Sequence, residues 1–184
     1  MRMRFPEVSY IRWAKSAPPV ACNLARSGVA PCPASRLGLR ASDLVAHLPS
    51  HDGYAPLVDA IAARYRVDRR RVFSVSGGTT YATWLAVAAA MNHASPAAEV
   101  IVERPTYEPL LRVPEALGYR VRRLERRFDE TFAIDLDRFR SLVNRRTRLA
   151  IVSNLQNPTG ARIPLAVVRK MAAMLADVGG FLLV

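Results

Sequence analysis

The chain has 184 residues, of which 51% are hydrophobic, and it carries a formal net charge of +12. This length suits a domain with a sizeable core, and this composition excludes a disordered chain. Nearly all of the positive charge is arginine, since Lys15 and Lys170 are the only lysines. Clustered arginine would favour nucleic acid, but no aromatic-interleaved basic motif accompanies these arginines. We therefore interpret the densest groups as solvated faces: Arg69–Arg71, Arg122 and Arg123 with Arg126 and Arg127, and Arg145 and Arg146 with Arg148.

Cys22 and Cys32 are too few for a disulfide framework, and neither has a histidine or cysteine partner at metal-ligand spacing. We therefore expect no metal site, and a reducing cytoplasm is the default location. The basic start of the chain is not followed by an apolar signal core. The longest apolar run, Ala82–Met91, is far shorter than the roughly 20 residues that span a bilayer, so no membrane partner is expected.

The N-terminal residues, up to about Arg40, are rich in proline and show little periodicity. This pattern predicts an extended arm with one short helix from Tyr10 to Lys15. A second helix is expected to follow Gly53–Leu57 and to end near Arg66. Its buried stripe is predicted from the i, i+4 spacing of three apolar residues: Leu57, Ile61 and Tyr65.

The next stretch has the outline of an anion site. Val72–Val75 is a β-branched and aromatic run that predicts a strand, Ser76–Thr80 is a glycine turn, and Tyr81–Asn92 is an alanine-rich helix. Free N–H groups in the first helical turn and the positive end of the helix dipole both favour a phosphate. Thr79 or Thr80 could add a hydroxyl donor. The alternative is that Gly77 and Gly78 only make a tight turn that caps the helix.

Strands and helices alternate through the rest of the chain, which predicts a three-layer α/β/α fold with a mostly parallel sheet. The expected elements are a strand at Glu99–Glu103, a strand at Tyr119–Leu124, a helix from Asp135, a strand at Arg148–Ser153, a helix after Pro164 and a strand at Phe181–Val184. The turn Asn154–Gly160 follows the fourth of these. A turn at the carboxyl end of a buried strand presents a side chain, here that of Asn157, into the crevice where open α/β sheets bind ligands.

These stretches, in this order, resemble the class I/II aminotransferases, the fold type I enzymes that depend on pyridoxal phosphate. The resemblance implies that Gly77, Gly78 and Thr79 match the turn that cradles the cofactor phosphate. Tyr107, two positions after Pro105, matches the aromatic residue that stacks on the pyridine ring. Asn157 matches the asparagine that binds the phenolic oxygen of the cofactor, in a turn where the following proline is cis in relatives.

The resemblance also extends to Asn23–Val29, in which Gly28 matches a glycine that lets the backbone pass close to the substrate. An ordinary turn glycine is the alternative. The sequence departs from the family at Leu48, where many relatives have a tyrosine that reaches the cofactor phosphate of the neighbouring subunit. No catalytic residue is expected in this chain, because the resemblance puts the Schiff-base lysine, and the aspartate that pairs with the pyridine nitrogen, beyond Val184.

We therefore interpret the chain as the first part of a longer, truncated aminotransferase that is inactive alone and forms a homodimer when full length. Residues 1–42 are expected to be an arm and part of the small domain, and residues 43–184 the first part of the large cofactor-binding domain. The reaction implied is amino-group transfer between an amino acid and a 2-keto acid. Two alternatives stay open: a lyase, decarboxylase or deaminase of the same fold, and a catalytically inactive remnant or basic nucleic-acid-binding module.

Overall fold

The computed structural model describes residues 6–22, 30–43, 53–92 and 94–184. The chain divides into two compact units. One falls within Met1–Lys15 and Gly77–Val184, and the other falls within Ser16–Ser76. The predicted domain boundary between residues 42 and 43 stays a prediction. In the part of the chain that the structure describes, no helix is long and apolar enough to cross a membrane.

The described residues of the unit within Ser16–Ser76 form the helix α2 (Ala55–Tyr65) and three 3-10 turns, which are η1 (Ala34–Leu37), η2 (Ala41–Asp43) and η3 (Arg69–Arg71). The second predicted helix is thus confirmed, but its predicted buried stripe is wrong. Val58 and Ala62 are buried, whereas Leu57 and Tyr65 are exposed. Both sets have the i, i+4 spacing of one helical face, so the spacing alone could not distinguish two adjacent faces.

The strand predicted at Val72–Val75 is also wrong. These residues follow η3 without forming a strand, and the Phe73 side chain is 64% exposed. A strand needs a neighbour that takes up its backbone hydrogen bonds. Within the described residues no strand pairs with this run. A β-branched composition by itself does not supply that partner.

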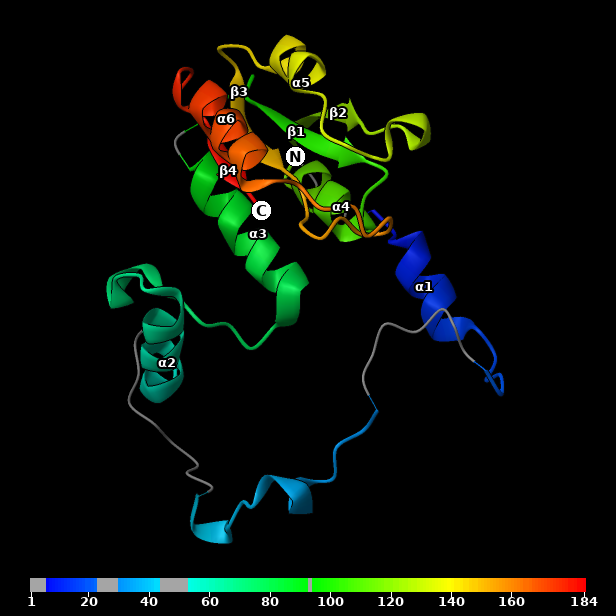
Figure 1. Cartoon of the computed structure of the whole chain (residues 1–184), viewed down its shortest axis with the longest axis vertical. Helices are drawn as coiled ribbons and strands as arrows, with labels where there is room; N and C mark the ends of the chain where they lie inside the picture. The colour runs from blue at the N-terminus through cyan, green and yellow to red at the C-terminus, as the bar shows by residue number, and fades with distance from the viewer. Residues whose placement is uncertain (1–5, 23–29, 44–52, 93) are drawn as a thin grey trace. The chain divides into compact units, whose positions relative to one another are not determined.

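The other unit begins with α1 (Ser9–Ser16) and contains a sheet flanked by helices (Figure 1). The short helix predicted near Tyr10 is confirmed as α1. The helices are α3 (Gly78–Met91), α4 (Glu108–Ala116), α5 (Leu136–Leu142) and α6 (Leu165–Ala176), with a 3-10 turn η4 (Phe128–Glu130). The strands are β1 (Glu99–Arg104), β2 (Arg120–Glu125), β3 (Thr147–Ile151) and β4 (Phe181–Leu183).

All four strands are parallel, and their order in the sheet is β2-β1-β3-β4. Two core clusters cover opposite faces of this sheet. Side chains from α3 and α4 pack on Val100 and Val102 of β1, whereas side chains from α5 and α6 pack on Ile101. Alternate residues of a strand point to opposite faces, so this division confirms the predicted three-layer α/β/α arrangement.

The sequence explains where several helices start. Asp135 caps α5, because its carboxylate accepts hydrogen bonds from the backbone N–H groups of Asp137 and Arg138. Pro164 precedes α6, at a position where the missing N–H of proline costs no helical hydrogen bond. In contrast, no side chain caps the first turn of α3, which also lacks an acidic residue. The N–H groups of that turn are therefore left for another partner.

Candidate cofactor site

The strand order creates a switch point between β1 and β3. From β1 the chain crosses through α4 to β2 on one side, whereas β3 and β4 lie on the other side of β1. Ligands of open α/β sheets bind at such a point, outside the carboxyl ends of the strands. Tyr107 follows β1 and Asn157 follows β3. Because β1 and β3 are adjacent and parallel, the two predicted cofactor contacts leave the same edge of the sheet.

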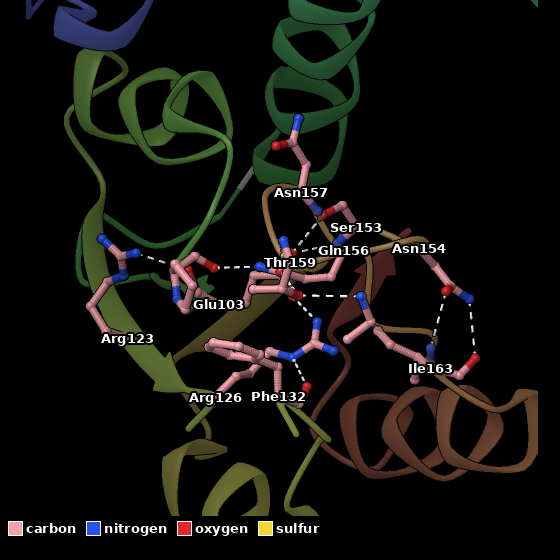
Figure 2. A network of polar contacts seen from close by, with 12 residues as sticks. Glu103, Arg123, Arg126, Phe132, Ser153, Asn154, Gln156, Asn157, Thr159 and Ile163 are labelled. Atoms are coloured by element: carbon pink, nitrogen blue, oxygen red, sulfur yellow. Dashed lines mark hydrogen bonds and ion pairs between the residues drawn. The ribbon is translucent and has the colours of Figure 1, made fainter. Parts of the chain in front are cut away.

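Gln156 connects the two loops at this edge. Its side chain is buried, and its Nε2 donates to the carbonyl oxygen of Pro105 at 2.6 Å. Its Oε1 accepts from the backbone N–H of Thr159 at 3.0 Å and also from the Thr159 hydroxyl. The turn after β3 is therefore tied to the segment that leads into Tyr107 (Figure 2).

Asn157 itself is exposed, and its backbone N–H donates to Ser153 Oγ at 3.0 Å. Figure 2 shows its side chain extending away from the polar network. Within the described residues, no hydrogen bond involves the Asn157 side-chain amide. The peptide before Pro158 is cis, as the resemblance implied. Ser153 thus holds the Asn157 backbone, and no group in the described part of the chain uses the Asn157 side-chain donor.

Tyr107 is the residue before α4, and it is half-buried against the core cluster on the α3 and α4 face. Its ring also meets that of Tyr10 edge to face, with 6.4 Å between centroids. The preceding residue, Thr106, has a buried hydroxyl that lacks a hydrogen-bond partner in the described structure. Tyr107 therefore has a packing role of its own, and its stacking on a cofactor ring stays a prediction.

The glycine turn lies at the start of α3. Gly77 is the N-cap residue, and an added Cβ there would lie 2.6 Å from Cβ of Tyr81, so only glycine fits. Gly78 has a φ of 70°, and a Cβ added there would meet nothing within 4 Å. Thr79 follows in the exposed first turn. Free N–H groups beside open space suit a phosphate.

An ion pair in the core was missed by the sequence interpretation. Arg126, assigned above to a solvated face, is 3% exposed, and its Nη1 lies 2.6 Å from Oε2 of Glu103, whose side chain is 0% exposed. Arg126 follows β2 directly, and β2 pairs with β1. Its guanidinium can therefore reach Glu103, which belongs to β1. The signal in the sequence was Glu103 itself, a carboxylate that ends an apolar strand and needs a buried partner.

The donor set fits a phosphorylated aromatic ligand. The start of α3 is uncapped and has two glycines, and the ring of Tyr107 and the free amide of Asn157 follow adjacent strands at one sheet edge. A groove of about 340 Å³ brings together the starts of α3 and α4, since Gly77, Thr80 and Pro109 all line it. Gly28 and Leu48 lie outside the described residues.

A model of the family "aminotransferase class I and II" matches residues 21–184. The chain belongs to this family. Its members depend on pyridoxal phosphate, which is the cofactor expected from the sequence. The parallel sheet with flanking helices is the fold that the solved aminotransferases share with this chain.

Three proteins illustrate the likeness of this aminotransferase-family chain. Capreomycidine synthase from Streptomyces vinaceus is 37% identical over 102 residues, which cover 55% of this chain and 25% of the synthase. N-Succinyldiaminopimelate aminotransferase from Mycobacterium tuberculosis is 28% identical, with a TM-score of 0.66 over 77% of this chain and 38% of that one. Aspartate aminotransferase from Thermus thermophilus, solved with maleate, is 26% identical, with a TM-score of 0.63 over 71% and 35%. The chain thus spans between a quarter and two fifths of each relative.

Proposed function

We propose that this chain supplies part of the cofactor site of a pyridoxal-phosphate-dependent aminotransferase. The observation that carries the proposal is the switch point between β1 and β3, at whose edge Tyr107 and Asn157 leave adjacent parallel strands. The open start of α3 adds the phosphate-binding element. Family membership supports the same assignment.

Each residue has a separate task in this proposal. The free N–H groups at the start of α3, with Gly77, Gly78 and the hydroxyl of Thr79, bind the phosphate. The ring of Tyr107 lies against the pyridine ring and fixes its orientation. The side-chain amide of Asn157 would hold the phenolic oxygen of the bound cofactor by donating a hydrogen bond, which would favour the deprotonated form of that oxygen. When bound, pyridoxal phosphate withdraws electrons from the α-carbon of an amino acid substrate.

The remaining parts of the proposal concern the whole protein. Residues 1–42 form the arm and part of the small domain, and residues 43–184 belong to the large domain. Gly28, which lies outside the described residues, is assigned to substrate binding in this proposal. The partners are an amino acid and a 2-keto acid, and the full-length protein is a homodimer. A cytoplasmic location is supported by Cys22 and Cys32, which are both exposed and unpaired.

Amino-group transfer between an amino acid and a 2-keto acid is the reaction that the two aminotransferase relatives favour. The likeness to a protein named capreomycidine synthase favours a second candidate, another pyridoxal-phosphate reaction on the same fold. Product analysis of the full-length protein separates them. Keto acid that forms only when a keto-acid acceptor is present indicates transamination, whereas turnover without an acceptor indicates the second candidate.

The cofactor site itself can be tested by titration of the chain with pyridoxamine 5′-phosphate. This form of the cofactor has no aldehyde, so it cannot attach to Lys15 or Lys170. We expect Asn157→Ala to weaken binding about 10-fold, the loss of one hydrogen bond to a charged oxygen. Asn92→Ala, which removes an exposed asparagine at the other end of α3, should leave binding unchanged. Equal affinities for the wild type and Asn157→Ala would refute the assignment of Asn157.

A further inference from the structure

We propose that Glu103 is a positioning residue for Asn157 and acts through the hydroxyl of Ser153. This inference rests on the proposed function, in which Asn157 contacts the cofactor. Among the described residues, Glu103 makes no direct hydrogen bond to Asn157. Its effect passes through one intermediate group, and Figure 2 shows the three residues in sequence.

The first link joins the end of β1 to the end of β3. Glu103 Oε1 accepts hydrogen bonds from the backbone N–H of Ser153 at 2.7 Å and from Ser153 Oγ at 2.8 Å. The carboxylate thus holds both the backbone and the side chain of the residue at which the chain leaves the sheet. Bonds from neutral donors to a carboxylate are about twice as strong as neutral pairs. Two of them on one oxygen define the position of Ser153.

The second link follows from the direction of the first. An ionised carboxylate can only accept, so the Ser153 hydroxyl must direct its hydrogen toward Glu103. Its lone pairs then remain available, and one of them accepts the backbone N–H of Asn157 at 3.0 Å. A hydroxyl that was free to rotate would not offer this acceptor consistently. The charge on Glu103 therefore determines how the Asn157 backbone is held.

The other carboxylate oxygen has its own partner. Oε2 accepts from Arg126 Nη1 at 2.6 Å, and Arg126 Nε donates to the carbonyl oxygen of Phe132 at 2.6 Å. Both side chains of the ion pair are fully buried. A buried carboxylate without an opposite charge would be expensive. Arg126 thus allows the ionised Glu103 to be buried beside Ser153. An apolar residue could pack in the place of Glu103, but it could not direct the Ser153 hydroxyl.

A buried ion pair can also be purely structural, and the distribution of contacts argues against that interpretation here. Gln156 holds the internal shape of the turn through Thr159, whereas Glu103 holds the point where the turn leaves β3. Between these two anchors the Asn157 backbone donates a hydrogen bond, whereas its side chain makes none to the residues that the structure describes. The network therefore holds the backbone of Asn157, and among the described residues no hydrogen bond occupies its side-chain donor, which is left for a ligand.

The test combines Ser153→Ala with Asn157→Ala in a double-mutant cycle on the same chain, with pyridoxamine 5′-phosphate as the probe. Ser153→Ala leaves the ion pair and the backbone contact to Glu103 in place, so the fold should persist. If Ser153 acts through Asn157, its loss weakens binding roughly three- to tenfold in the wild-type background and not at all in the Asn157→Ala background. Ser153→Thr, which keeps the hydroxyl, should restore affinity. Equal losses in both backgrounds would overturn the proposal.

Amide hydrogen exchange at Asn157 supplies a second measurement that needs no ligand. Ser153→Ala should raise the exchange rate of the Asn157 N–H, and Ser153→Thr should return it to the wild-type rate. Glu103→Gln should raise it as well, because glutamine has a single acceptor oxygen and cannot serve both Arg126 and Ser153. If Glu103→Gln does not fold, the exchange rate of the Asn157 N–H in Ser153→Ala decides the test alone. An unchanged rate in Ser153→Ala would overturn the proposal.

The proposed cofactor site and the positioning role of Glu103 can fail separately. If the wild-type chain binds no pyridoxamine 5′-phosphate, the proposed function fails for this chain, and the exchange rates then decide whether Glu103 and Ser153 hold Asn157. If the chain binds the probe but the cycle is additive, the cofactor assignment stands and the positioning role of Glu103 is wrong. Glu125→Gln serves as the control throughout, since the ion pair of the Glu125 side chain with Arg104 lies at the surface.

Discussion

The carboxylate of Glu108 accepts a hydrogen bond from the backbone N–H of Tyr10 at 2.8 Å, although the two residues lie 98 positions apart. Tyr10 is in the first turn of α1, whose N–H groups have no helical partner. Glu108 therefore caps α1 from another helix. This hydrogen bond is the main reason why the pKa of Glu108 lies below its ordinary value, and Arg112 lowers the pKa further.

We predict that Glu108→Ala releases α1. The substitution removes the cap of the helix, which contributes about 1 kcal/mol in typical cases, and amide exchange across Ser9–Ser16 should become faster. Glu115→Ala is the matched control, because Glu115 shares Arg112 with Glu108 but, among the described residues, makes no hydrogen bond to α1. Equal exchange rates in the two variants would show that Glu108 does not hold the helix.

A second prediction concerns pH. The side chain of Glu99 is buried, and its pKa is lowered first by the hydrogen bond from Asn144 and then by the charges of Arg146, Arg122 and Arg120. A lowered folded-state pKa contributes stability above the unfolded value, about 4.3 for glutamate, and this contribution disappears as the pH falls through the folded pKa.

Chemical unfolding measured between pH 7 and pH 3 should therefore show a steeper loss of stability in the wild type than in Glu99→Gln. The surface variant Glu125→Gln should follow the wild-type curve, since exposed ion pairs contribute at most about 1 kcal/mol. Parallel curves for the wild type and Glu99→Gln would contradict this account.

A third prediction separates backbone strain from phosphate binding. Gly78 and Gly179 have φ values of 70° and 71°, and neither has an atom closer than 3.8 Å to an added Cβ. Substitution by alanine should therefore cost both variants a similar stability, about 1–2 kcal/mol. Only Gly78→Ala should also weaken the binding of pyridoxamine 5′-phosphate, because the new methyl group enters the space at the start of α3. Equal binding by both variants would remove Gly78 from the site.

The core offers a fourth prediction. Phe139 is fully buried in the cluster that α5 and α6 form on the sheet, so Phe139→Ala should lower the free energy of unfolding by about 3–5 kcal/mol. Phe128 is 84% exposed, and Phe128→Ala should change it by less than about 0.5 kcal/mol. Thermal or denaturant melts of the two variants provide the comparison. A loss for Phe139→Ala as small as that for Phe128→Ala would mean that the core cluster around Phe139 contributes little.

The periodicity of the sequence was enough to predict the parallel sheet. The strands at Glu99–Arg104 and Arg120–Glu125 and the helix after Asp135 each combine an apolar pattern with a clear start or stop signal. Such signals are local, so they can be seen without knowledge of the neighbours. The run at Val72–Val75 had the composition of a strand without a pairing partner, and there local propensity gave the wrong answer.

The sequence by itself determined the alternation of strands and helices and, through family resemblance, the cofactor, and it named the candidate cofactor residues. Tertiary structure alone decided that Tyr107 and Asn157 share one edge, because strand order is a long-range property. It also decided that Arg126 is buried while neighbouring arginines reach the surface. A guanidinium leaves water only when the fold brings a carboxylate such as Glu103 to it, and the order of residues along the chain does not contain that distance.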